Sequence, residues 1–111
     1  MIWAFDEING RMIYVNPTVE EALGYNDAEF YARPLLWFDL IHPEDRPLAA
    51  TLNHTMREGK RPITYVLRFR KKAGSYVGLT TVVKPILDNR GKIVRTEGAA
   101  IALAGEGEDT P

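Results

Sequence analysis

The chain contains no cysteine. That absence excludes disulfide bonds, thiolate metal sites and cysteine nucleophiles, and it fits a reducing compartment. The sequence also lacks any apolar run that approaches the roughly 20 residues of a membrane-spanning helix. Asp6 and Glu7 interrupt the N-terminal region before the apolar segment of a signal peptide forms. We therefore expect a cytoplasmic domain without direct membrane contact.

An excess of charge of either sign is missing as well. The net charge is −1, so no overall field attracts nucleic acid or a membrane. The one basic cluster comprises Arg68, Arg70, Lys71 and Lys72. Its two arginines form the polar side of an amphipathic strand, whereas a nucleic-acid site would interleave basic and aromatic residues over a face. We expect no nucleic-acid partner.

The sequence has no glycine-rich phosphate loop and no spacing typical of metal ligands. Its paired carboxylates, Glu20-Glu21 and Glu44-Asp45, are adjacent in sequence, so on a helix their side chains diverge and form no acid–base dyad. Ser75 lacks a recognisable histidine–carboxylate partner. We therefore predict that the domain itself is not an enzyme and binds no metal. A catalytic domain elsewhere in a longer protein is left open.

With 111 residues, the chain has room for one domain. The patterns predict, in order, a strand at residues 2–8, a returning strand at 12–15, a helix opened by Asn16 and closed by Gly24, a short helix opened by a capping box at Asn26, a long helix at 43–58, and strands at 62–70, 76–86 and 92–103. Asn9-Gly10 predicts a two-residue type I′ turn between the first two strands. Strands, then helices, then strands indicate an α+β fold, an antiparallel sheet with helices on one face.

The segment around His42-Pro43 divides this pattern. The residue before proline is pushed away from the helical region, so the chain bends there. Pro43 suits the first turn of the long helix, where Glu44 and Asp45 lie at its positive end. We interpret His42 as a residue that holds the bend by hydrogen bonding.

Three motifs carry a resemblance to a known family. They lie at residues 13–17 with 20–25, at residues 39–46 (DLIHPEDR) and at residues 68–76 (RFRKKAGSY). In this order they resemble PAS domains, the sensory and interaction modules of many signalling proteins. The resemblance implies a five-stranded antiparallel sheet in the order 2-1-5-4-3, with helices that enclose a cavity against it.

On this basis we predict a single PAS domain at residues 1–104 and a flexible tail or linker at residues 105–111. The resemblance also bears on cofactors. In haem-binding relatives the ligand position matches Ala49, whereas His54 is out of phase with Leu52 and Met56, so haem is disfavoured. Flavin that reacts through a cysteine adduct is excluded by the lack of cysteine, and the cofactor stays unknown.

The apolar positions of the central stretch, the long helix and the inward strand faces predict the lining of the cavity. The candidates are Trp37, Leu40, Ile41, Leu52, Met56, Tyr65, Leu67, Leu79 and Thr81. A filled core is the alternative interpretation. A small-molecule ligand would find its polar contacts in the hydroxyls of Thr81 and Tyr65.

The outer face of the sheet is predicted to be more apolar than solvent requires, which suits a homodimer or a flanking helix. Its candidates are Val66, Tyr76, Val82, Ala100 and Ala102. Two functions stay open. The first is a sensory or regulatory domain of a larger signal-transduction protein, of histidine kinase or cyclic-dinucleotide enzyme type, that passes a ligand- or partner-driven change to an output domain in the same chain. The alternative is a ligand-free protein–protein dimerisation module.

Overall fold

The computed structural model describes residues 1–102, so the predicted tail at residues 105–111 lies outside the described part. The elements follow the order β1 (Ile2–Asp6), β2 (Arg11–Val15), α1 (Val19–Leu23), α2 (Asp27–Ala32), α3 (Leu36–Asp39), a 3₁₀ helix (Pro43–Asp45), α4 (Arg46–Gly59), β3 (Ile63–Arg70), β4 (Tyr76–Leu87) and β5 (Ile93–Ala102). None of the helices in residues 1–102 is long and apolar enough to cross a bilayer.

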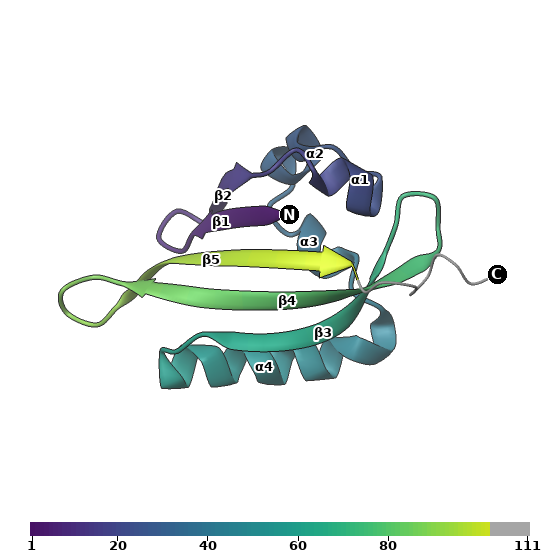
Figure 1. The fold of residues 1–111 in the computed structure, drawn as a ribbon. Helices are drawn as coiled ribbons and strands as arrows, with labels where there is room; N and C mark the ends of the chain where they lie inside the picture. The colour runs from purple at the N-terminus through teal and green to yellow at the C-terminus, as the bar shows by residue number, and fades with distance from the viewer. Residues whose placement is uncertain (103–111) are drawn as a thin grey trace.

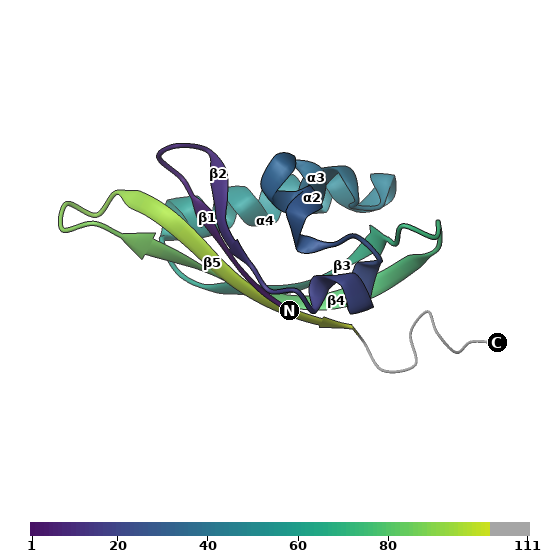
Figure 2. The same cartoon turned by 90° about the horizontal axis from the view of Figure 1, so that it is seen from above.

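The five strands form one antiparallel sheet in the order β2-β1-β5-β4-β3 (Figure 1). The last strand of the chain therefore lies in the centre, between the first strand and β4. Helices α2, α3 and α4 gather on one side of this sheet (Figure 2). The predicted α+β class, the strand order and the one-sided helices are confirmed.

The connection between β1 and β2 differs from the predicted two-residue turn. Four residues, 7–10, separate the strands, and of its two predicted turn residues only Gly10 has a positive φ, at 70°. The Asp6 carboxylate accepts the backbone N–H groups of Ile8 at 2.9 Å and Asn9 at 3.0 Å. This aspartate turn supplies the local hydrogen bonds, so the type I′ geometry is not required.

The helix starts follow the predicted chemistry in part. The capping box is present, since Asn26 accepts the N–H of Glu29 at 3.1 Å and the Glu29 carboxylate accepts the N–H of Asn26 at 3.0 Å. The first helix is shorter than predicted. It begins at Val19, because Asn16 binds the N–H of Thr18 at 2.9 Å in a turn that precedes the helix.

The core fills the space between the helices and the inner face of the sheet. Its centre is an aromatic cluster of Phe30, Trp37 and Phe69, with ring centroids 5.8 Å apart for Phe30 and Trp37 and 4.9 Å apart for Trp37 and Phe69. Phe30 and Phe69 are fully buried. Inclined rings at these separations add to the stabilisation that burial supplies. The cluster packs α2 and α3 onto β3.

Candidate functional site

A cavity of ≈ 120 Å³ lies between α4 and the inner face of the sheet. The α4 wall places its residues at the i, i+3, i+4 spacing of one helical face. The lining comprises Trp3, Phe5, Glu7, Met12, Pro34, Trp37, Phe38, Ile41, Ala49, Leu52, Asn53, Met56, Arg57, Ile63, Tyr65, Leu67, Val83 and Thr96. Aromatic, aliphatic and thioether groups dominate this wall, and a few polar groups interrupt it, which is the usual composition of a small-molecule site.

The polar groups of the cavity cluster around Glu7, just after β1. Its carboxylate accepts a hydrogen bond from Arg57 Nη2 at 2.9 Å and another from Thr96 Oγ1 at 3.0 Å. Arg57 Nε in turn donates to Asn53 Oδ1 at 3.1 Å. The cluster ties the C-terminal part of α4 to the end of β1 and to β5. Because Glu7 is largely buried, its pairing with Arg57 compensates the cost of placing a charge there.

Tyr65 adds a neutral polar group to the wall. Burial raises the pKa of its hydroxyl to about 12, so the phenol stays protonated at neutral pH. Nearby, the indole rings of Trp3 and Trp37 lie with centroids 6.0 Å apart and planes tilted by 52°. These groups allow hydrogen bonding and ring contacts without introducing a further charge.

Most of the predicted lining residues do border the cavity: Trp37, Ile41, Leu52, Met56, Tyr65 and Leu67. Leu40, Leu79 and Thr81 do not, although all three are buried. Leu79 faces Leu67 across β3 and β4, next to the pair of Phe69 and Val77, where the aromatic cluster occupies the interior. The open space lies further along the sheet, toward Val83.

The first hairpin supplies a wall that we did not predict. Trp3, Phe5 and Met12 border the cavity from β1 and β2. The alternation of Trp3 and Phe5, together with the position of β1 beside β5 in the expected strand order, was a usable signal for the first two. Glu7 and Arg57 carried no such signal, because they lie 50 positions apart in the chain.

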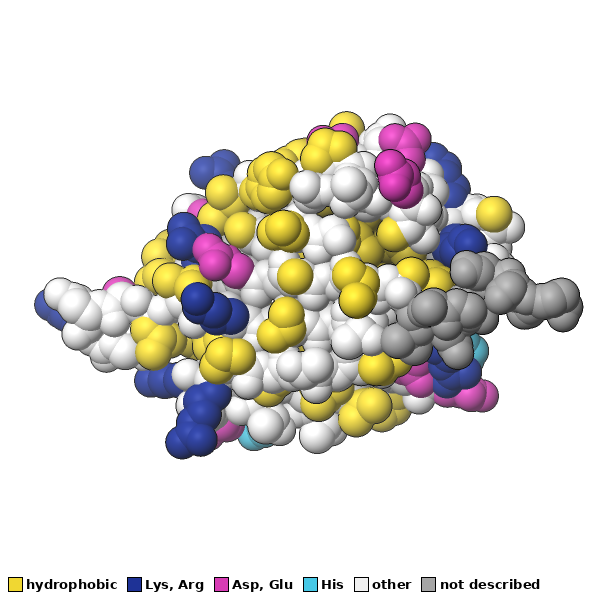
Figure 3. Space-filling view, in the orientation of Figure 1, with side chains coloured by type: hydrophobic (Ala, Val, Ile, Leu, Met, Phe, Trp, Pro, Cys, Tyr) yellow, Lys and Arg dark blue, Asp and Glu magenta, His cyan; other side chains and the backbone are white. Residues whose placement is uncertain are grey.

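The second candidate surface is the outer face of the sheet, which Figure 1 turns toward the reader, with the helices behind it in the view from above (Figure 2). Val66, Val82 and Tyr76 lie on it, as predicted, and 49% of Val66 is exposed. The ring of Tyr76 is partly covered by His42, with centroids 4.6 Å apart. Figure 3 shows hydrophobic side chains spread over this face among polar and charged ones.

The prediction for β5 on this surface is wrong, because the side chains that face outward are shifted by one residue from the predicted ones. Ala100 pairs with Thr81, and Ala102 pairs with Leu79; both partners face the core, and Ala100 is buried. Ile101 takes the outer position, and 68% of it is exposed. We call Ile2, Val66, Val82 and Ile101 the outer patch, because all four are exposed and their strand pairing puts them on the outer face.

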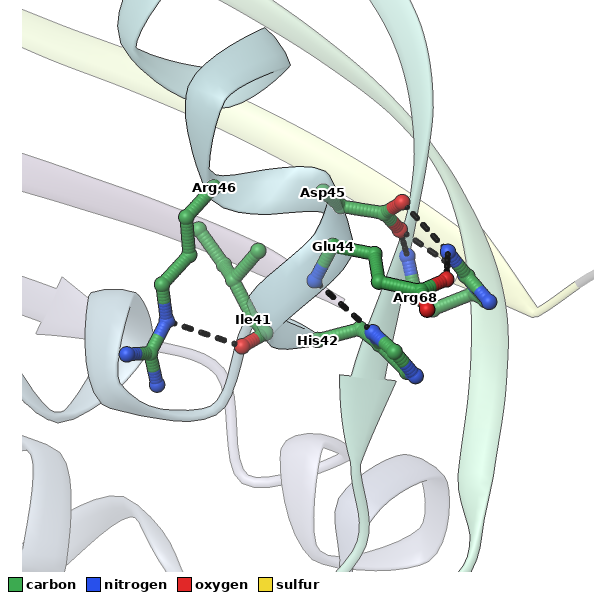
Figure 4. Close-up of polar contacts among 6 residues, drawn as sticks. All are labelled: Ile41, His42, Glu44, Asp45, Arg46 and Arg68. Atoms are coloured by element: carbon green, nitrogen blue, oxygen red, sulfur yellow. Dashed lines mark hydrogen bonds and ion pairs between the residues drawn. The ribbon is translucent and has the colours of Figure 1, made fainter.

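The bend before α4 is held by polar contacts (Figure 4). His42 Nδ1 accepts the N–H of Glu44 at 3.0 Å, which confirms the interpretation of His42 as a bend residue. Asp45 accepts three hydrogen bonds from Arg68, from the backbone N–H at 2.9 Å, from Nε at 3.0 Å and from Nη2 at 2.7 Å. Arg68 thereby lowers the pKa of Asp45 to about 2. This pair attaches the start of α4 to β3.

Replacing Asp45 by asparagine is expected to lower the free energy of unfolding at pH 7 by about 1–2 kcal/mol. The upper end of this range follows from the shift of the Asp45 pKa from an ordinary 3.8 to about 2. Solvent screening at the partly exposed Arg68 reduces the contribution of the pair to stability. Since the folded state lowers this pKa, the contribution is present above about pH 4 and is lost as the pH falls toward 2. Urea denaturation of wild type and variant at a series of pH values measures the difference, which should shrink from about pH 5 downward.

Glu44→Gln is the matched control. Glu44 also approaches Arg68, but at 3.4 Å and with 76% of its side chain exposed, so its removal should change stability by less than about 0.5 kcal/mol. Equal pH profiles for the two variants would contradict the assignment to Asp45.

The histidines and the acidic side chains show no arrangement for a metal within residues 1–102. His54 is exposed on α4 and does not border the cavity. Among the described residues that line the cavity there is therefore no histidine for an axial position of haem, and the cofactor stays unknown.

Comparisons with known proteins agree on one family. A family model described as PAS fold matches residues 12–100. The White collar 2 protein of Neurospora crassa is 38% identical over 77 residues, which make up 68% of this chain and 14% of that protein. The chain therefore spans only a small part of this curated relative.

Solved structures show the same fold. The N-terminal domain of a diguanylate cyclase with PAS/PAC sensor from Marinobacter aquaeolei has a TM-score of 0.80 and 20% identity, and the match covers 91% of this chain and 92% of that chain. A sensory box histidine kinase/response regulator from Burkholderia thailandensis has a TM-score of 0.75 and 20% identity, with 92% and 75% covered. Because the family model matches residues 12–100, which is most of its length, the chain belongs to the PAS fold family.

Proposed function

We propose that this domain is a sensory and regulatory module of a larger signal-transduction protein. A ligand in the cavity, or a partner on the sheet, shifts the domain between two arrangements, and the change passes to an output domain in the same chain. The cavity between α4 and the sheet is the observation that carries this proposal. Residues of all five strands and of helices α3 and α4 border it, so that its occupancy can act on most of the fold at once.

The route to an output domain is proposed to be β5. This strand lies in the centre of the sheet, contributes Thr96 to the cavity wall and ends at Ala102, the last described residue. Thr96 binds Glu7, and Glu7 binds Arg57 on α4. A ligand that moves α4 would therefore act on β5 through two hydrogen bonds.

The type of output domain is proposed by analogy. The Marinobacter protein is a diguanylate cyclase with a PAS/PAC sensor, and the Burkholderia protein is a sensory box histidine kinase/response regulator. We infer that the output here is of histidine kinase or cyclic-dinucleotide enzyme type. This step depends on fold-level likeness. Catalysis would then belong to the output domain, and a cytoplasmic location stays a prediction.

A ligand-free dimerisation module is the second candidate, and the outer patch favours it. Its four aliphatic side chains are exposed around the central strands, where a second copy could bury them. A twofold axis through this face would place the same residues on both sides of the interface.

Native mass spectrometry of the purified domain, with a denatured control, separates the two candidates. The sensory proposal expects an additional non-covalent mass that is lost on denaturation. A protein mass without any addition, in a dimer that Val66→Asp converts to a monomer, would overturn ligand sensing in favour of the dimerisation module. Ile8→Asp is the matched control, because Ile8 is an exposed isoleucine in the first turn and lies outside the outer patch.

A further inference from the structure

The size of the cavity limits what it can hold. Its ≈ 120 Å³ is well below the roughly 300–1,000 Å³ of pockets that bury drug-sized ligands. An apolar cavity of about 150 Å³ engineered in another protein holds a single benzene molecule. The volume in this domain is somewhat smaller and corresponds to one six-membered ring; because the cavity is partly open to solvent, a small substituent on the ring can extend toward the opening.

The wall favours a flat, polarisable molecule. Trp3 and Trp37 present inclined indole rings, and Phe5 approaches from the same hairpin as Trp3. Met12 and Met56 add thioether groups from β2 and α4. Aromatic rings gain from edge and offset contacts with other rings and from contacts with methionine sulfur, beyond what their buried area supplies. An aliphatic molecule of equal volume would gain binding energy from the burial of its surface alone.

The charges of the wall are already paired. Among the described lining residues, the charged ones are Glu7 and Arg57, which bind each other at 2.9 Å. Thr96 and Asn53 complete the hydrogen bonds of this pair. A charged ligand would enter without a free counter-charge, and burying an unpaired charge is costly. The site therefore selects against ions.

One hydrogen-bonding group on the ligand can still be satisfied. Tyr65 borders the cavity, and its neutral hydroxyl lies beside the side chain of Thr81, which leaves the hydroxyl capacity for one further hydrogen bond. Asn53 uses Oδ1 to accept from Arg57, and no hydrogen bond from its Nδ2 is found within residues 1–102. The Asn53 amide nitrogen can donate a hydrogen bond, and the Tyr65 hydroxyl can donate or accept one. Together they can bind a single hydroxyl or carbonyl substituent.

We propose that the cavity takes an uncharged, single-ring aromatic compound with one hydroxyl or carbonyl substituent, the phenol class. This inference deepens the proposed function and rests on it, since it names the class of ligand that the sensory site receives. The ring lies among the indole, phenyl and thioether groups, and the substituent meets Tyr65 or Asn53. Arg57 and Glu7 keep their mutual pairing when the ligand is bound.

The test is ¹⁹F NMR titration of the purified domain with 4-fluorophenol. We expect saturable binding that phenol displaces. Two comparison compounds should bind at least about tenfold more weakly, a difference of about 1.4 kcal/mol. They are 4-fluorobenzoate, which has one ring but a negative charge, and cyclohexanol, used as a competitor without an aromatic ring.

Variants locate the binding in the cavity. Ala49→Leu adds three carbon atoms at the α4 wall and should weaken 4-fluorophenol binding at least tenfold. Ala28→Leu makes the same change at an exposed position of α2 and should leave binding unchanged. Ile63→Phe obstructs the cavity from β3 and gives a second measurement should the first variant fail to fold, which circular dichroism reports.

Equal binding of 4-fluorophenol to wild type and to both obstructed variants would place it on the surface and overturn the proposal. Equal affinity for 4-fluorobenzoate or cyclohexanol would overturn the assigned class. If native mass spectrometry finds a retained ligand that is charged or aliphatic, the class is wrong and the sensory function stands. If no mass is retained and no probe binds, both the class and ligand sensing are wrong.

Discussion

Replacement of Phe69 by alanine is expected to lower the free energy of unfolding by about 3–5 kcal/mol, the usual cost of deleting a buried phenylalanine ring. The side chain is fully buried, and its ring centroid lies 4.9 Å from that of Trp37. The backbone of Phe69 also pairs with Ile41, which joins the segment before α4 to the edge of the sheet. Loss of the ring therefore loosens α3 and β3 together. Urea denaturation followed by circular dichroism measures the change.

Because a domain of this size has a total stability of about 5–15 kcal/mol, Phe69→Ala should remove a large share of it. Val66→Ala on the same strand is the matched control. Val66 points to the opposite, solvent side, so we expect a change within about 0.5 kcal/mol. A cost below about 1 kcal/mol for Phe69→Ala would mean that the aromatic cluster does not organise the core.

The alternation of side chains in β3 explains why this strand could be predicted from sequence. Ile63, Tyr65, Leu67 and Phe69 face inward, and their neighbours are exposed. The capping box at Asn26 was equally local, since its two partners lie three residues apart. Features determined by neighbouring residues were therefore accessible, whereas the strand order came from the family resemblance.

The phase of β5 was not accessible in the same way. Residues 98–102 read Gly-Ala-Ala-Ile-Ala, a run of small or apolar residues without alternation between polar and apolar side chains. The pairing of β4 with β5 also shifts between Ile86 and Leu87, so counting along the hairpin from the turn misplaces the strand by one residue. Both effects exchanged Ala100 and Ile101 between the two faces.

The position of the cavity depends on packing that no single stretch of sequence encodes. Leu79 and Thr81 face inward, as predicted, yet other side chains fill the space beside them. Val83, two residues further along β4, borders the open part. Alternation identifies the residues that point inward, but the volume that remains empty depends on rings contributed by several distant elements.

Replacement of Gly98 by alanine is expected to destabilise the domain by about 3 kcal/mol, at the upper end of the cost of overfilling a core. Gly98 lies opposite Trp3 in the pairing of β1 with β5. A Cβ atom there would lie far inside van der Waals contact with Cζ2 and Cε2 of the indole, and 2.8 Å from Nε1. Replacing a glycine within a strand by alanine normally raises the free energy of unfolding by about 0.5–1 kcal/mol. A decrease would therefore identify the clash with the indole as the stronger effect.

Gly59→Ala is the control, because nothing lies within 4 Å of a Cβ added at that glycine near the end of α4. We expect this variant to be neutral or slightly more stable than the wild type. Chemical denaturation of both variants gives the comparison. Destabilisation by Gly59→Ala equal to that of Gly98→Ala would mean that the effect is general to glycine replacement.

A double-mutant cycle with Trp3→Phe tests whether the indole is the obstacle. The smaller ring lacks the atoms that the new Cβ would meet, so Gly98→Ala should cost at least about 1 kcal/mol less in this background, within the range of coupling for residues in contact. An unchanged cost would show that the backbone of β1, and not the indole, limits the space. Since Trp3 also borders the cavity, a displaced indole should weaken 4-fluorophenol binding as well. The glycine on β5 would then have two effects, seating Trp3 against the sheet and shaping the cavity wall on that side.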